Sequence, residues 1–123
     1  MKKIDRDKVY EKYDGKCAYC GKPVFRKTFQ VDHIIPKANW MREVLRLKLI
    51  GDVNGLDNLN PCCRRCNIWK HSNSLEVFRI DVAAQLERAR RYSRNFRMAE
   101  DFGLVEATGK KNIEFYFEKV RER

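Results

Sequence analysis

Two pairs of cysteines constrain this chain more than any other feature of its sequence. Cys17 and Cys20 form one pair and Cys63 and Cys66 form the other, with two residues between the cysteines of each pair. Such a pair can direct both sulfurs onto one ion from a tight turn, and two pairs complete a tetrahedral shell. Thiolates held this close repel one another unless a cation neutralises them, so the ion contributes to folding. We therefore predict a structural Zn²⁺ site with all four positions filled by sulfur.

Disulfide bonds are the alternative interpretation of the same cysteines. The chain becomes charged directly after Met1 and lacks the apolar segment of a secretory signal, so we expect a reducing, cytoplasmic location in a bacterium or a phage-infected host cell. No apolar run approaches the ~20 residues that a membrane-spanning helix needs. The fifth cysteine, Cys62, has the wrong spacing to Cys66 for a ligand pair and is interpreted as a small core residue.

The charge of the chain indicates the kind of partner it binds. The 123 residues suit a single domain, 1–123, and they include 27 Lys and Arg against 17 Asp and Glu, which gives a net charge of +10. Such an excess favours a polyanion, and nucleic acid is the usual one. A membrane surface is the competing polyanion, but the sequence shows no strongly amphipathic terminal helix to bind it.

Local patterns predict short helices and strands in the N-terminal half of the chain. Asp5 is suited to cap a helix over 5–13, and the run 29–35 is typical of a strand that ends at Pro36. The remaining predictions are a helix over 39–50, an extended segment over 56–61 and a helix over 64–71.

The C-terminal half is predicted to be mainly helical. Its apolar residues are spaced 3, 4, 4 and 3, which predicts one stripe on a long helix: Leu75, Phe78, Val82, Leu86 and Ala89. Asn73 and Glu76 resemble a capping box at its start, and Phe102-Gly103 ends a further helix. Alternation over 113–117 predicts a terminal hairpin with 104–106.

A second group of chemically capable residues lies between and beside the cysteine pairs. It comprises Asp32-His33 at the end of the predicted strand, Asn58, and Asn67 directly after Cys66. In this order, residues Lys16 to His71 resemble the HNH endonucleases of the His-Me finger superfamily, in the variant called HNN. The resemblance implies an α+β fold with a ββα-metal core over about 16–71, to which we add a C-terminal helix and hairpin extension over about 72–123.

The resemblance also implies a role for each of these residues. His33 matches the general base, Asp32 its metal-binding partner, and Asn58 the central residue that organises the loop around the histidine. Asn67 matches the third position, where it supplies a neutral oxygen ligand suited to Mg²⁺ or Mn²⁺. His71, four residues further along the predicted helix, matches the second metal-binding histidine of colicin-type nucleases.

These roles together predict hydrolysis of DNA phosphodiester bonds, with 5′-phosphate and 3′-hydroxyl products. An imidazole of near-neutral pKa can take a proton from water, while a hard divalent cation stabilises the charge that develops on phosphate. Arg64, Arg65 and Lys70 lie beside the predicted site and are interpreted as phosphate-binding residues. RNA is the alternative substrate, and cutting both strands with one site per domain requires a homodimer or two successive nicks.

The resemblance leaves the biological setting open between phage, mobile element and restriction system. A non-catalytic zinc-ribbon module that binds nucleic acid also explains the cysteines and the charge, although not the order of Asp32, His33, Asn58 and Asn67. A zinc-stabilised protein-interaction domain is a third alternative, and absence of DNA binding at low salt would favour it.

Overall fold

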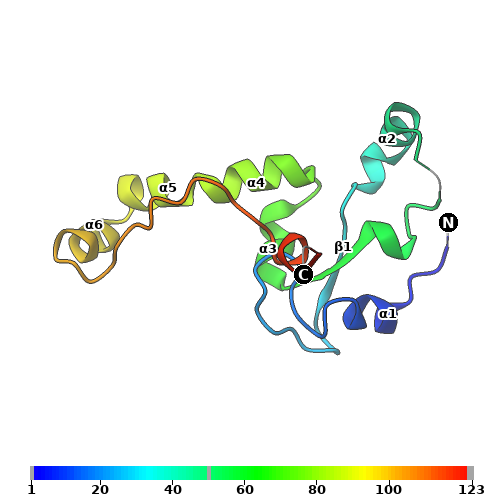
Figure 1. The fold of residues 1–123 in the computed structure, drawn as a ribbon, viewed down its shortest axis with the longest axis horizontal. Helices are drawn as coiled ribbons and strands as arrows, with labels where there is room; N and C mark the ends of the chain where they lie inside the picture. The colour runs from blue at the N-terminus through cyan, green and yellow to red at the C-terminus, as the bar shows by residue number, and fades with distance from the viewer. Residues whose placement is uncertain (1, 50, 122–123) are drawn as a thin grey trace.

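The computed structural model describes residues 2–49 and 51–121, and it mixes short helices with a small sheet. Its elements in chain order are α1 (Arg6–Glu11), β1 (Gln30–His33), the 3-10 helix η1 (Lys37–Asn39), α2 (Trp40–Leu47), the 3-10 helix η2 (Leu56–Asn58), β2 (Leu59–Cys62), α3 (Arg64–Lys70), α4 (Leu75–Ala83), α5 (Gln85–Tyr92), α6 (Arg94–Asp101) and α7 (Tyr116–Arg121). Figure 1 shows α4, α5 and α6 leading away from the body that holds the sheet. Within the described residues no helix is long and apolar enough to cross a membrane.

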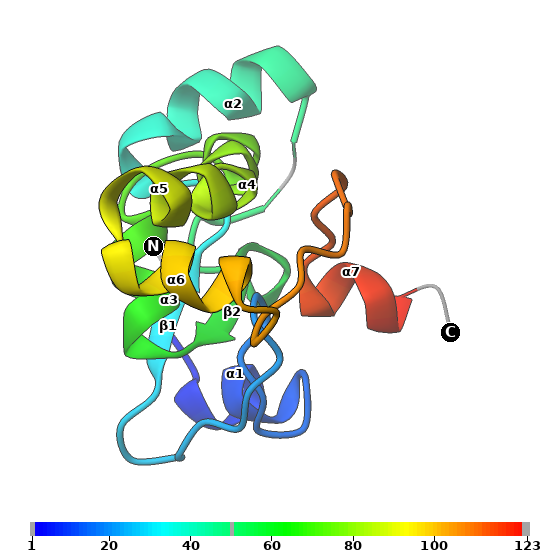
Figure 2. The same cartoon turned by 90° about the vertical axis from the view of Figure 1, so that its left-hand side faces the viewer.

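The sheet consists of β1 and β2 paired antiparallel. Asp32 lies opposite Asn60 and His33 lies opposite Leu59 in this register. All four residues of β2 are buried, and α3 follows it after a single residue and packs against β1. Both views place α3 beside the sheet (Figures 1 and 2). The end of β1 that carries Asp32 and His33 is thereby covered by α3.

The core joins segments that are far apart in the sequence. Val9 of α1 and Leu59 of β2 are almost inaccessible to solvent. Phe78 of α4 packs in the same cluster with Phe115 and Phe117 of the C-terminal segment, which comprises residues 113–121. Burial of large aromatic side chains is the main source of stability in a domain of this size. The C-terminal segment is therefore part of the same core as the sheet.

The N-terminal elements agree with the sequence patterns. The Asp5 carboxylate caps α1 by accepting from Lys8 N at 3.3 Å, and β1 lies within the strand predicted over 29–35. The helix predicted over 39–50 is η1 followed by α2, and its last position, Ile50, lies outside the described residues. The segment predicted over 56–61 as extended begins as a 3-10 turn and becomes β2 at Leu59.

The apolar stripe of the C-terminal half does not lie on one helix. The chain breaks between α4 and α5, and the inner part of the stripe packs on the core while Leu86 in α5 is 38% exposed. The capping box prediction was wrong by one residue, because Ser74 is the N-cap of α4 and its hydroxyl accepts from Val77 N at 3.2 Å. The helix expected to end at Phe102 ends at Asp101.

The predicted C-terminal hairpin was also wrong. Residues 104–115 contain no strand, and α7 begins at Tyr116. The backbone N–H groups of Tyr116 and Phe117 donate instead to Tyr19 O and Ala18 O, at 3.1 and 2.8 Å. The alternation over 113–117 arises because Phe115 and Phe117 are both buried in the core, whereas Glu114 is exposed and Tyr116 is half-buried.

Candidate functional site

The four paired cysteines converge on one point, as their spacing predicts. Their sulfur atoms all lie within 4.8 Å of one another, and Cys20 Sγ lies 3.9 Å from Cys63 Sγ. Tetrahedral Zn²⁺ with Zn–S bonds of ~2.3 Å places its sulfurs about 3.8 Å apart. The four thiolates therefore fit a closed structural zinc site, and Cys62 lies buried in the core, as predicted.

The electrostatics of the sulfur cluster favour a bound cation. A hydrogen bond from the Cys66 thiol lowers the pKa of Cys17 to about 4, and the same bond raises the pKa of Cys66. Burial raises the pKa of Cys20, and repulsion from the Cys17 thiolate adds to that rise. A divalent cation removes that repulsion and allows all four sulfurs to ionise.

The loop that carries the first cysteine pair is tied closely to the sheet. Cys17 N donates to Lys22 O and Ala18 N donates to Pro61 O, each at 2.8 Å. Gly21 turns the chain with a φ of +78°, and a Cβ there would lie 2.9 Å from the Tyr116 ring. The second pair lies at the start of α3, where Cys63 is the N-cap residue. An ion held by both pairs would join this loop to α3.

Asp32 of β1 contacts this loop and is 4% exposed. The Tyr19 hydroxyl donates to Asp32 Oδ2. Lys70 Nζ lies 3.3 Å from Oδ1 and 3.1 Å from Oδ2 of the same carboxylate. Burial raises the pKa of Asp32, and the nearby Lys70 ammonium opposes that rise. A carboxylate accepts about four hydrogen bonds, so Asp32 keeps acceptor capacity beyond these two partners.

His33 has a partner that the sequence patterns did not identify. Its Nε2 lies 2.7 Å from Asn54 Oδ1, and Asn54 Nδ2 donates to Lys2 O at 2.8 Å. The donation to Lys2 turns the amide oxygen of Asn54 toward the imidazole. His33 Nε2 therefore carries the proton in this arrangement, which leaves Nδ1 as the basic nitrogen.

Asn58 connects the end of β1 to the loop that carries Asn54. Its Oδ1 accepts from Ile35 N at 2.8 Å, and its Nδ2 donates to Ile35 O at 3.1 Å and to Val53 O at 3.0 Å. Asn58 is 7% exposed, so these bonds satisfy a buried amide. They hold the turn after His33 beside the loop before Asn58.

The predicted residues of α3 separate into different environments. Asn67 is half-buried on the helix that packs against β1, but no hydrogen bond joins its side chain to His33 among the described residues. Arg64 and Arg65 are exposed. His71 lies beyond the helix end with a φ of +53°, and its Nδ1 lies 2.9 Å from Ser72 Oγ.

The burial of Lys70 contradicts the interpretation of this residue as a phosphate ligand. Its side chain is 0% exposed, and besides Asp32 it donates to His33 O at 3.0 Å and Ile34 O at 3.3 Å. An ammonium enclosed by a carboxylate and two carbonyls cannot reach a phosphate at the surface. Lys70 instead neutralises Asp32 and holds the backbone at the end of β1.

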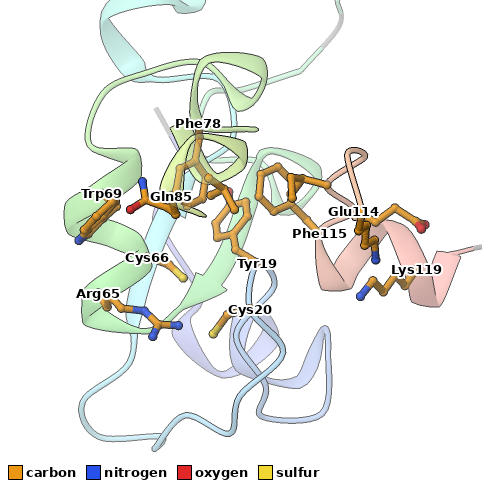
Figure 3. Close-up of a pocket in the computed structure, with 13 residues that line it drawn as sticks. Tyr19, Cys20, Arg65, Cys66, Trp69, Phe78, Gln85, Glu114, Phe115 and Lys119 are labelled. Atoms are coloured by element: carbon orange, nitrogen blue, oxygen red, sulfur yellow. The ribbon is translucent and has the colours of Figure 1, made fainter. Parts of the chain in front are cut away.

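A separate cavity of about 530 Å³ is lined in part by Tyr19. Figure 3 shows Tyr19 and Phe115 beside it, with Trp69 and Arg65 from α3 at one edge and Lys119 at the opposite edge. Asp32, His33, Asn58 and Asn67 are not among its lining residues. The cavity is thus distinct from the group of residues at the end of β1.

Comparison with known proteins identifies the region that carries this site. Residues 17–73 match the family model described as HNH endonuclease. The CRISPR-associated endonuclease Cas9 of Corynebacterium diphtheriae is 30% identical over 91 residues, which cover 67% of this chain and 7% of that protein. The crystal structure of the Type II-C Cas9 enzyme from Actinomyces naeslundii matches with a TM-score of 0.48 and 30% identity, over 63% of this chain and 8% of that one. The chain thus spans less than a tenth of the length of either relative.

Proposed function

Because residues 17–73 match the HNH endonuclease family, we propose that this protein is a metal-dependent endonuclease that hydrolyses DNA phosphodiester bonds. The observation that supports it most is that two neighbouring residues at the end of β1, beside α3, have defined environments. Asp32 is buried and hydrogen-bonded, and His33 is oriented by Asn54. A protein that only binds nucleic acid has no need to bury an acid there or to orient a histidine.

In this proposal His33 is the general base. Asn54 Oδ1 accepts a hydrogen bond from Nε2–H of His33, so Nδ1 is the nitrogen that takes a proton from the attacking water. Asn58 sets the position of the Asn54 loop relative to β1 and therefore acts on His33 through Asn54. The hydrogen bond to Asn54 holds the ring in one tautomer and one orientation. This avoids the loss of rate that a wrongly oriented base would cause.

Asp32 and Asn67 would hold the divalent ion of this site. Both offer oxygen, the donor that Mg²⁺ and Mn²⁺ prefer, and they come from β1 and α3, which pack against each other. When bound, such an ion stabilises the charge that develops on the phosphate and the leaving oxygen. His71 remains a candidate additional ligand, since the C-terminal end of α3 places it at the surface.

The surface charge suits a polyanionic substrate. Arg64 and Arg65 are exposed at the start of α3, and the whole chain carries a net charge of +10. We propose that these two arginines contact the DNA backbone. Such contacts strengthen binding at low salt without reading sequence.

The test is cleavage of supercoiled plasmid by the zinc-loaded protein with Mg²⁺ or Mn²⁺. We expect His33→Ala to lower the rate about 100-fold or more, which is the size of a general-base contribution. Asn54→Ala should lower it less, because the base remains but its tautomer is no longer fixed. Zinc content and thermal unfolding of each variant show whether the fold is retained.

Equal cleavage by wild type and His33→Ala would remove His33 from the mechanism. DNA binding without cleavage under any divalent ion would favour the non-catalytic zinc-ribbon module instead. Parallel assays with an RNA of the same sequence distinguish the two classes of substrate. Gel filtration at the assay concentration shows whether a homodimer is present.

A further inference from the structure

The side chain between the first two zinc ligands reaches the proposed catalytic carboxylate. Tyr19 lies between Cys17 and Cys20, and its hydroxyl donates to Asp32 Oδ2. Asn60 Nδ2, across the sheet from Asp32, lies 3.4 Å from the same hydroxyl oxygen and is placed to donate to it. With Asn60 as donor, the hydroxyl proton of Tyr19 is directed to Asp32.

The ring of Tyr19 is held on several sides. Phe78, Phe115 and Phe117 meet it edge-on, with ring centroids 5.4, 5.2 and 5.9 Å away and interplanar angles of 81°, 85° and 90°. Figure 3 shows Tyr19 between Phe78 and Phe115, with Cys20 close by. Since Tyr19 is only 4% exposed, its hydroxyl has little freedom to choose another partner.

The backbone of Tyr19 is fixed as well. Tyr116 N donates to Tyr19 O at 3.1 Å, and the neighbouring Ala18 bonds both Pro61 and Phe117. Sulfur ligands directly before and after this dipeptide attach it to the zinc site. The position of one hydroxyl group thus depends on the zinc site, on β2 and on the C-terminal segment.

Two partners contact the Asp32 carboxylate, and they do not contact the same set of oxygen atoms. Lys70 contacts both carboxylate oxygens, whereas Tyr19 contacts Oδ2 alone. Without the tyrosine hydroxyl, Oδ2 keeps only its contact with Lys70, so the orientation of the carboxylate is no longer fixed from the side of Tyr19. Partners of this kind set the orientation of a metal ligand, and their loss typically weakens metal binding 10- to 100-fold.

We infer that Tyr19 is a positioning residue, which orients the Asp32 carboxylate for the divalent ion. The loop of residues 17–20, here called the zinc loop, is then a determinant of that ion's affinity. The inference rests on the proposed function, because it takes Asp32 to be a ligand of that ion. It gives the zinc loop a role beyond joining two segments of chain.

The experiment measures Mn²⁺ affinity of the zinc-loaded protein without DNA, from the electron paramagnetic resonance signal of free Mn²⁺. Tyr19→Phe removes only the hydroxyl and keeps the ring contacts with the three phenylalanines. We expect Mn²⁺ to bind about 10-fold more weakly, or worse, with zinc content unchanged. Tyr92→Phe is the matched control, because Tyr92 is 75% exposed on α5 and its variant should bind like wild type.

Asp32→Asn separates this inference from the proposed function. If Asp32→Asn weakens Mn²⁺ binding and Tyr19→Phe does not, Tyr19 has no positioning role and the proposed function stands. If Asp32→Asn binds Mn²⁺ like wild type, both the ligand assignment and the role of Tyr19 are overturned.

A nuclear magnetic resonance measurement on protein that retains Tyr19 tests the inference even if the Tyr19→Phe variant fails to fold. Tyrosine labelled with ¹³C at Cζ gives one resonance for each of the five tyrosines, and Tyr→Phe variants at the other four identify that of Tyr19. We expect this resonance to move on addition of Mg²⁺ in wild type but not in Asp32→Asn. A Tyr19 resonance that stays fixed while Mg²⁺ binds through Asp32 would overturn the inference.

Discussion

Lys70 places a positive charge in the interior of the protein, beside Asp32. A lysine beside two arginines on a predicted basic helix is ordinarily a solvated charge, because lysine is rarely buried. Here the ammonium bonds Asp32 and two carbonyls at the end of β1, and no part of the side chain is exposed. The fold compensates its desolvation with an ion pair and hydrogen bonds.

Replacing Lys70 with methionine tests this structural role. Removal of one partner of a buried ion pair leaves the other charge uncompensated, which typically costs 3–5 kcal/mol. We expect Lys70→Met to lower the free energy of unfolding by about 3 kcal/mol in chemical denaturation of the zinc-loaded protein. Lys8→Met, at an exposed position of α1, is the control and should change little. A loss below about 1 kcal/mol for Lys70→Met would mean that the buried pair contributes little.

Other residues of the site differ in how far the sequence could identify them. The cysteine spacing predicted the sulfur cluster directly, because two-residue pairs constrain geometry locally. Asp32, His33 and Asn58 were identified by resemblance, and the structure adds their partners. Asn54 and Tyr19 carried no signal of their own, since their roles depend on contacts across 21 and 13 residues of sequence.

At the scale of elements, the C-terminal segment is attached to α4 through one arginine. Arg79 Nη1 and Nη2 each donate to one Glu118 oxygen at 2.7 Å, and Nη1 also donates to Ile113 O at 2.7 Å. The guanidinium lies over the Phe115 ring, 4.7 Å from its centroid. Two parallel bonds to one carboxylate give this contact a defined geometry. The contact holds α7 and the residues before it against the aromatic core.

The pH dependence of stability tests this contact. Hydrogen bonds from Arg79 hold the pKa of Glu118 below its ordinary value of 4.5. Because the folded state favours the ionised form, the stabilisation is complete above pH 4.5 and is lost as the pH falls through the lowered pKa. We expect Glu118→Gln to cost about 1 kcal/mol at pH 7, an amount already reduced for solvent screening, and the difference from wild type to shrink below pH 4.5.

The control for this experiment is Glu114→Gln, at an exposed position of the same segment. Its stability should follow that of wild type across the same pH range. A Glu118→Gln deficit that is equally large at pH 7 and in acid would show that packing, rather than the ion pair, is responsible.

Elements were predictable from sequence where the signal is local. The Asp5 cap, β1 and α3 follow from caps, alternation and helical spacing within a few residues. The hairpin prediction failed because alternation reports burial on one side without naming the partner strand. Phe115 and Phe117 are buried against Tyr19, nearly a hundred residues earlier in the chain, and nothing local indicates that pairing.

At the scale of the whole molecule, the zinc site, the sheet and the C-terminal segment meet around Tyr19. The zinc loop, β2 and the start of α7 bond one another through Ala18 and Tyr19. Part of this assembly lies outside residues 17–73, which match the HNH endonuclease family. The proposed catalytic group at the end of β1 is therefore supported from segments that the family match does not include.

The most direct test of the proposed chemistry is a crystal structure of the zinc-loaded protein soaked with Mn²⁺, with anomalous scattering used to locate the ion. We predict a manganese peak bonded to oxygens of Asp32 and Asn67, on the side that His33 Nδ1 faces, together with a zinc peak among the four sulfurs. Manganese bound elsewhere, or a His33 ring turned away from an ion at Asp32, would contradict the account.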